Sequence, residues 1–101
     1  MAKRLISSET ESFNKFGGNY EILKLFKDAG FDAYDFSMFE DSINRLIDYD
    51  DYKQKARELR KYADSLGIVC NQAHAPFPTV KPGDDEFNKY IFSKIVRAIE
   101  V

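Results

Sequence analysis

A short pattern that occurs twice constrains the fold more than any other feature: a helix, a glycine, and then an apolar strand entry. Residues 25–31 read Leu-Phe-Lys-Asp-Ala-Gly-Phe, and residues 62–68 read Tyr-Ala-Asp-Ser-Leu-Gly-Ile. Gly30 and Gly67 can adopt the left-handed conformation that commonly ends a helix. A chain that repeats strand and helix in this way is predicted to form parallel βα units with right-handed crossovers.

The spacing of apolar residues predicts where these elements lie. Tyr34 and Phe36 alternate with Asp35 and Ser37, and a period of two is typical of a strand. A stripe of Ala56, Leu59, Ala63 and neighbouring residues has the period of an amphipathic helix. We therefore expect one α/β domain over residues 1–101, with strands near 4–10, 33–37 and 68–74 and helices near 20–29, 52–66 and 85–101.

Polar residues just before the helical stretches predict the helix starts. Asn19 is expected to cap the first helix, Asp50 or Asp51 the second, and Asp84 or Asp85 the third.

The predicted second and third strands have faces of different character. We expect helices to cover the bulky residues Tyr34, Phe36 and Val69. The opposite face is smaller and more polar, as on the inside of a barrel. We assign five residues to it: Asp35, Ser37, Cys70, Gln72 and His74.

Three parallel strands leave two open edges and suggest a larger sheet. A complete (β/α)₈ TIM barrel needs about 250 residues, and the 101 residues here end inside a helical pattern. We expect three parallel βα units that form the N-terminal part of a TIM barrel. A complete small α/β domain is the alternative.

Composition excludes several classes of protein. The net charge of −2 and a pI near 5.4 give no basic surface for nucleic acid or for an anionic membrane. Cys70 is the single cysteine, so no disulfide framework is expected and a reducing compartment fits best. The sequence contains no signal peptide and no membrane span, so we expect a cytoplasmic protein.

His74 is the single histidine, and Ala75-Pro76 directly after it should end the third strand. The carboxyl ends of parallel strands are where ligands bind in α/β proteins. His74 can act as a general acid or base near neutral pH, bind a metal, or hold the loop backbone. Its sequence neighbours lack the spacing of a metal site, so we favour a pocket residue together with Gln72.

Carboxylates at the strand ends are further candidates. An isolated Asp35 among apolar residues is costly, so it should face a wet pocket or pair with His74 or Lys15. Glu9 and Glu11 share a strand face if the first strand extends that far, and exposed loop acids are the alternative.

A pair of glycines and the cysteine complete the candidates. Gly17 and Gly18 could let a phosphate approach the first helix, although no complete phosphate-binding motif surrounds them, which favours an ordinary loop. Cys70 has no partner base and is predicted to be an inert core cysteine.

Two segments resemble the xylose-isomerase-like sugar-phosphate isomerase/epimerase barrels. Residues 21–36, with Ala-Gly-Phe before the strand, resemble the first helix and second strand of that superfamily. Residues 63–77, with Gln72-Ala73-His74-Ala75-Pro76-Phe77, resemble its third-strand motif of histidine, one residue, proline and an aromatic. The resemblance covers the first three βα units of the barrel.

The resemblance implies a function for the parent fold. Members typically bind a divalent metal (Mn, Mg or Zn) through residues of later strands and move a proton between adjacent carbons of a sugar or sugar phosphate. Asp35 stands where the family commonly has an acidic residue, with a shorter reach than Glu, and His74 matches the third-strand histidine. The resemblance thus implies a substrate pocket lined by His74, Asp35, Glu11, Glu9 and Gln72, with catalytic residues unassigned.

Because the later strands are not in this sequence, we expect the chain alone to bind no metal tightly, to be inactive, and to form homo-oligomers through its open sheet edges. A non-enzymatic α/β binding or interaction module, or a scaffold derived from a barrel, is the alternative. An AP-endonuclease-like enzyme, the related branch in which the histidine binds zinc, is disfavoured by the acidic pI.

Overall fold

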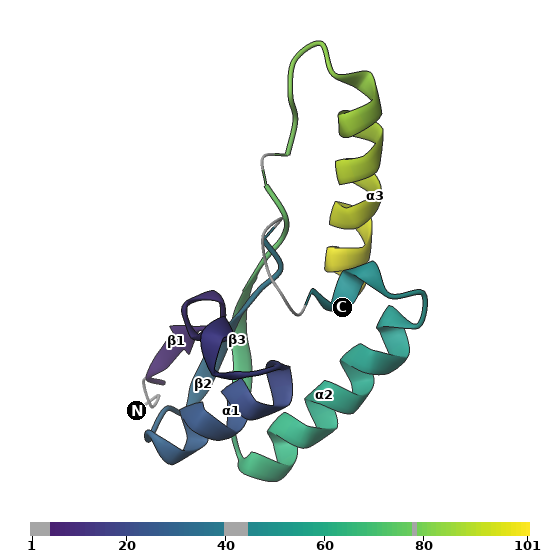
Figure 1. Ribbon diagram of the computed structural model, residues 1–101. Helices are drawn as coiled ribbons and strands as arrows, with labels where there is room; N and C mark the ends of the chain where they lie inside the picture. The colour runs from purple at the N-terminus through teal and green to yellow at the C-terminus, as the bar shows by residue number, and fades with distance from the viewer. Residues whose placement is uncertain (1–4, 40–44, 78) are drawn as a thin grey trace.

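The computed structural model describes residues 5–39, 45–77 and 79–101, and it shows an α/β fold (Figure 1). The elements are β1 (Ser7–Glu9), η1 (Glu11–Phe16), α1 (Asn19–Asp28), β2 (Ala33–Ser37), η2 (Leu46–Asp48), α2 (Tyr52–Leu66), β3 (Val69–His74) and α3 (Asp85–Glu100), where η denotes a 3₁₀ helix. The predicted alternation of strands and helices is confirmed.

The three strands form one parallel sheet in the order β1-β2-β3. The central strand β2 pairs Ala33 with Ser7 on one side and with Val69 on the other. Within the described residues β1 and β3 are therefore both edge strands. β1 is shorter than the predicted 4–10: residue 4 lies outside the described residues, Leu5 and Ile6 precede the strand, and after Glu9 the chain turns into η1, which the sequence pattern did not indicate.

Helices α1 and α2 pack on one face of this sheet and form the core with it. Phe26 of α1, Tyr34 and Phe36 of β2, and Leu59 of α2 belong to one buried cluster, together with Ile68 before β3. Burying a side chain of this size contributes about 1.5–3 kcal/mol. The hydrophobic face of each helix thus fixes which face of β2 is covered and leaves the other face for polar residues.

A one-residue shift in register changes the predicted faces of β3. Tyr34 pairs with Cys70, but the next residue of β2, Asp35, pairs with Gln72, so Asn71 is an extra residue in β3. Two of our predictions were therefore wrong. Cys70 shares the helix-covered face with Tyr34, and Val69 is 46% exposed on the other face.

The helix boundaries follow local chemistry in most places. Gly67 ends α2 with a φ of 75°, in the left-handed conformation that the pattern predicted. Asp84 caps α3, and its Oδ1 accepts a hydrogen bond of 3.0 Å from the Phe87 amide. Asn19 is the first residue of α1 rather than its cap, since Gly18 takes that position, and Asp51 precedes α2 without making a side-chain cap.

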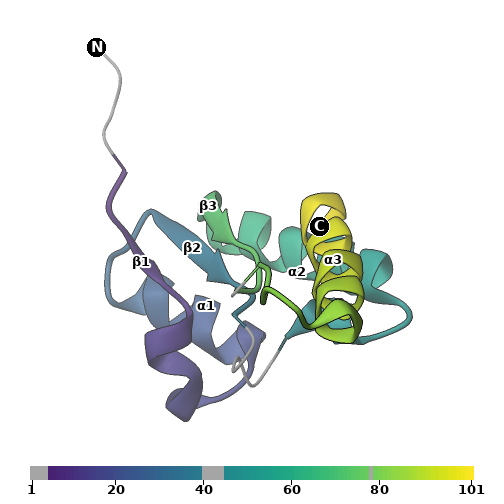
Figure 2. The same ribbon diagram turned by 90° about the horizontal axis from the view of Figure 1, so that it is seen from above.

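Helix α3 extends beyond the carboxyl ends of the strands instead of packing along the sheet (Figure 1). Seen from above, it lies to one side of the strands, next to β3 (Figure 2). Ile91 is its one fully buried residue among those described. The contacts that hold α3 are largely polar, and they centre on η2.

Several polar groups around η2 make this attachment, and Asp48 takes part in it through Lys94. Oδ1 of Asp48 accepts hydrogen bonds from Nη2 of Arg45 at 2.7 Å and from Nζ of Lys94 at 3.0 Å. The same Nη2 of Arg45 also donates to the Tyr90 hydroxyl at 2.9 Å, and Arg97 donates to the carbonyl of Ile47 at 2.9 Å. Arg45 itself is buried.

Candidate functional site

His74 and Asp35 lie next to each other at the carboxyl ends of β3 and β2. Nδ1 of His74 is 2.9 Å from Oδ1 of Asp35. The His74 side chain is 40% exposed and the Asp35 side chain 16%. Asp35 therefore pairs with His74, which was one of the alternatives that the cost of an isolated carboxylate left open beside a wet pocket.

The pairing fixes the tautomer of the imidazole. A carboxylate can only accept, so Nδ1 of His74 carries the hydrogen. In the neutral ring Nε2 is then left with a lone pair. The side-chain nitrogen of Gln72 lies 3.4 Å from Nε2, at the outer limit of a hydrogen bond. Asp35 thus orients a ring nitrogen that can accept a proton, in the way that an Asp orients the base of a catalytic triad.

Glu9, at the end of β1, is engaged by its surroundings. Oε2 accepts from the Ser37 hydroxyl at 2.8 Å and from the Glu11 amide at 3.0 Å, and Oε1 accepts from the amide and the hydroxyl of Ser12. Burial acts to raise the pKa of the Glu9 carboxyl, but these hydrogen bonds together outweigh it and lower the pKa. A carboxylate with four donors is a structural anchor and a poor general base.

Glu11 was expected to share a strand face with Glu9 if the first strand extended that far, and the strand ends before it. It is the first residue of η1, so it cannot share a strand face with Glu9. The sequence pattern did not predict the other residues that surround Glu9. The Thr10 hydroxyl accepts a hydrogen bond from the Ser37 amide at 2.9 Å, and Ser12 binds Glu9. Hydroxyl residues following a strand in the sequence Ser-Glu-Thr-Glu-Ser were the available signal.

An aromatic pair lies beside the imidazole, with Phe39 next to His74 and Phe77 packed on Phe39. The ring centroid of Phe39 lies 5.5 Å from that of His74 and 4.8 Å from that of Phe77, the latter pair in an edge-to-face arrangement. Phe77 is 54% exposed. His74 therefore has the Asp35 carboxylate on one side and an apolar wall on another.

The described residues do not form a metal site. No group of three or more histidine, cysteine, aspartate or glutamate side chains comes together among them. The carboxylate oxygens of Glu9 already accept hydrogen bonds from four donors, and Oδ1 of Asp35 is paired with His74. Few oxygen atoms are therefore left to bind a metal. Zinc is held by at least three such protein donors in most catalytic sites, and the described residues bring no such set together.

No family model, curated protein or solved structure matches this chain significantly.

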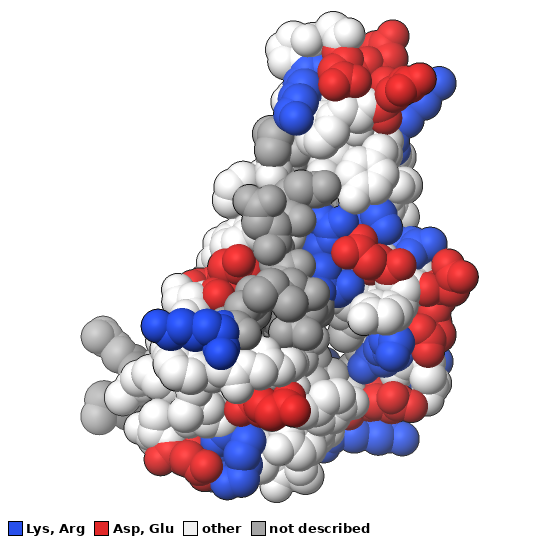
Figure 3. Space-filling model, in the orientation of Figure 1, with Lys and Arg blue, Asp and Glu red and all other residues white. Residues whose placement is uncertain are grey.

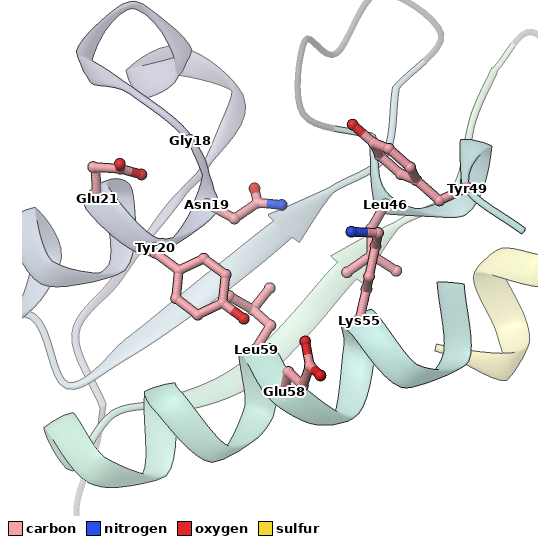
Figure 4. A pocket seen from close by; sticks show the side chains of 9 residues that line it. All are labelled: Gly18, Asn19, Tyr20, Glu21, Leu46, Tyr49, Lys55, Glu58 and Leu59. Atoms are coloured by element: carbon pink, nitrogen blue, oxygen red, sulfur yellow. The ribbon is translucent and has the colours of Figure 1, made fainter. Parts of the chain in front are cut away.

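A cavity of about 260 Å³ lies near the Gly17-Gly18 pair, between the start of α1 and α2 (Figure 4). Lys55 and Glu58 of α2 both line it and present opposite charges. A Cβ on Gly17, where φ is 137°, would lie 2.9 Å from Cβ of Glu21. Gly17 is therefore needed for close packing on Glu21, and this acidic side chain in the first turn does not suit a phosphate.

Cys70 is exposed, which corrects the prediction of a core cysteine. Partial burial of the sulfur raises the pKa of its thiol, and Sγ donates to the Gln72 carbonyl at 3.2 Å. The thiolate is therefore disfavoured, and Cys70 is not an activated nucleophile.

The surface shows no concentration of one charge on the face in Figure 3, where basic and acidic side chains are interspersed. None of the described helices has both the length and the apolar character needed to cross a bilayer.

Proposed function

We propose that this chain contributes a sugar-binding, proton-transferring site to a parallel-stranded barrel of the xylose-isomerase-like kind. The observation that supports the proposal is the 2.9 Å pair of His74 and Asp35 at the carboxyl ends of neighbouring parallel strands. Ligand sites of α/β sheets lie at these ends. The pair also lies on the sheet face opposite the one covered by α1 and α2, where a barrel has its lumen.

His74 carries the chemistry in this proposal. Its Nε2 takes a proton from the hydroxyl-bearing carbon next to the substrate carbonyl, and the bonding electrons move onto the carbonyl oxygen to give an enediolate. The hydroxyl proton of the first carbon then passes to this oxygen, and Nε2 returns its own proton to the former carbonyl carbon, so that the carbonyl and the hydroxyl exchange places. Asp35 holds Nδ1 and stabilises the imidazolium that forms.

Two neighbours of His74 would act on binding. Gln72 is exposed on the same sheet face and can hydrogen-bond to a sugar hydroxyl. Phe77 offers an exposed ring against which the C–H side of a sugar can pack. Glu9 fixes the end of β1 beside Ser37 without meeting the substrate.

Binding is the property to test on this chain, because His74, Asp35, Gln72 and Phe77 all belong to it. We expect fructose 6-phosphate or xylulose 5-phosphate at millimolar concentration to shift the imidazole ¹⁵N resonances of His74 in NMR spectra. Asp35→Asn should change the ring tautomer and weaken this binding about tenfold, whereas Asp28→Asn, on the exposed surface of α1, should leave it unchanged. The proposal would be contradicted if the His74 resonances did not shift at about 50 mM ligand, a concentration far above typical KM values.

The open edges of β1 and β3 form a second part of the proposal: association with another copy of the chain. Unpaired parallel edges are prone to pair with further strands. Sedimentation velocity over a hundredfold range of concentration, about 2–200 μM (a range around typical dissociation constants), should show a rising mean mass. A constant monomer mass would contradict it. We also place the protein in the cytoplasm, in keeping with its single free cysteine.

A non-enzymatic interaction module is the second candidate. It is favoured by the exposed apolar side chains of α3, since Phe92 is 67% and Ile99 79% exposed. In that case His74 and Asp35 serve only to stabilise the strand ends. Asp35→Asn would then lower the free energy of unfolding while sugars fail to bind the wild-type chain.

A further inference from the structure

A cavity of about 210 Å³ lies on the helix-covered side of the sheet, between β3, α2 and the C-terminal end of α3. Buried side chains of Tyr34, Met38 and Leu59 line it, and Cys70 and Ala73 of β3 form an exposed part of its wall. The cavity exists because α3 extends beyond the strands instead of packing along β3 (Figure 1). Its lining is mainly apolar, and it opens to the surface.

A second cavity of about 370 Å³ adjoins the first and shares Ala56, Arg60 and Val101 with it. Four basic residues of α2 line this second cavity, facing the carboxylates of Glu100 and of Val101 at the end of the chain: Lys53, Arg57, Arg60 and Lys61.

The charges in the second cavity do not cancel. Glu100 lies 3.7 Å from Lys53 and also binds the Tyr52 hydroxyl. Arg57, Arg60 and Lys61 have no carboxylate within ion-pair distance among the described residues. The groove is therefore net positive where it meets the apolar cavity.

Arg60 occupies the junction. It lines both cavities and also a small one of about 40 Å³ that reaches Tyr34 and Cys70. A guanidinium presents a planar fork of donors that matches a carboxylate or phosphate. We propose that the joined cavities bind a small amphipathic anion, with its apolar tail beside Cys70 and Ala73 and its carboxylate or phosphate on Arg60.

Volume and charge together define the ligand. An apolar cavity of 150 Å³ is known to admit benzene, so the space here accommodates a tail of about six to eight carbon atoms. Each further buried methylene should raise the affinity about fourfold until the cavity is full. The uncompensated cations favour an anionic head over a neutral or cationic one. Because the site lies on the opposite sheet face from His74, it is independent of the sugar site.

Octanoate is a suitable probe, used far below its micelle concentration and followed by ¹H–¹⁵N NMR. We expect saturable shifts of amides in α2 and β3, including Ala73, and weaker shifts with hexanoate. Octanol, octylammonium and inorganic phosphate each lack one half of the ligand chemistry and should bind at least about tenfold more weakly.

Two variants separate the parts of the site. Arg60→Gln removes the proposed anion partner at an exposed position and should weaken octanoate binding about tenfold, while Lys89→Gln on α3 makes the same change in net charge and should have no effect. Ala73→Met fills the cavity and should abolish binding of the tail. If Ala73→Met fails to fold, the comparison of Arg60→Gln with Lys89→Gln still decides.

Three results would overturn the proposal. The first is equal binding of octanoate and octylammonium, and the second is equal binding of octanoate by wild type and Arg60→Gln. The third is that the amide shifts of Ala73 and Cys70 change with protein dilution and not with octanoate, because a second copy of the chain would then fill the cavity.

Discussion

The attachment of α3 through Asp48 gives the sharpest test of how burial sets the strength of an ion pair. Asp48→Asn removes the charge that meets Arg45 at 2.7 Å and Lys94 at 3.0 Å. Asp28→Asn is the matched control, because Asp28 pairs with Lys24 at 2.6 Å within α1. The two pairs have similar distances and differ in exposure.

The expected magnitudes follow from that exposure. The Arg45 side chain is only 5% exposed, and breaking a buried pair costs about 3–5 kcal/mol. Asp48 is 43% exposed, so water can replace part of its role, and we expect a loss of about 2 kcal/mol in the free energy of unfolding. Asp28 and Lys24 are both more than half exposed, and their pair should contribute less than about 0.5 kcal/mol.

Urea unfolding followed by circular dichroism measures both variants. Burial acts to raise the pKa of Asp48, but Arg45 and Lys94 outweigh it and hold the pKa below its ordinary value. The stabilisation is therefore complete above the unfolded carboxyl pKa of about 3.9 and is lost as the pH falls through the lower folded value. Equal losses for the two variants at pH 7, or a difference between wild type and Asp48→Asn that persists at pH 2, would refute this reasoning.

Three further predictions test other parts of the molecule. Glu9→Gln should cost about 1–2 kcal/mol at pH 7 in urea unfolding, and because the Glu9 pKa is lowered the wild type should lose this advantage below about pH 4. Gly17→Ala should lower the melting temperature more than Gly83→Ala, since both glycines have positive φ but a Cβ meets a neighbour within 4 Å only at Gly17; equal shifts would contradict the close packing. Burial raises the pKa of Tyr34 to about 12, and the hydrogen bond to Glu100 raises the pKa of Tyr52. Absorbance titration should therefore show late-ionising tyrosines, Tyr34→Phe should remove one of them, and stability should fall above about pH 10 because the unfolded chain ionises first; a late ionisation that Tyr34→Phe leaves unchanged would count against it.

Regular periodicity explains which elements the sequence predicted well. The bounds of β2 and α2 agree with the predicted 33–37 and 52–66, because side-chain alternation and an apolar stripe each report one buried face. The cost of an isolated carboxylate left a wet pocket, His74 and Lys15 open as explanations of Asp35, and the structure shows the pair with His74. These features depend on local pattern or on one strong energetic term.

Other features depend on contacts that no local pattern reports. The direction of α3 is set by Asp48 and Arg97, which bond across long sequence separations, so its apolar positions could not reveal that it leaves the sheet. The role of Glu9 as an anchor depends on donors that converge only when η1 folds. The sugar substrate and the barrel remain proposals.

The extra residue Asn71 has a consequence for how β3 tolerates changes in length. If Asn71 were paired regularly opposite Asp35, His74 would fall opposite Met38, on the side that the helices cover. Because Asn71 is instead left out of the ladder, a chain that lacks it should still place Gln72 opposite Asp35 and His74 opposite Ser37. The imidazole therefore owes its side of the sheet to a local irregularity of the backbone that the rest of the strand does not need.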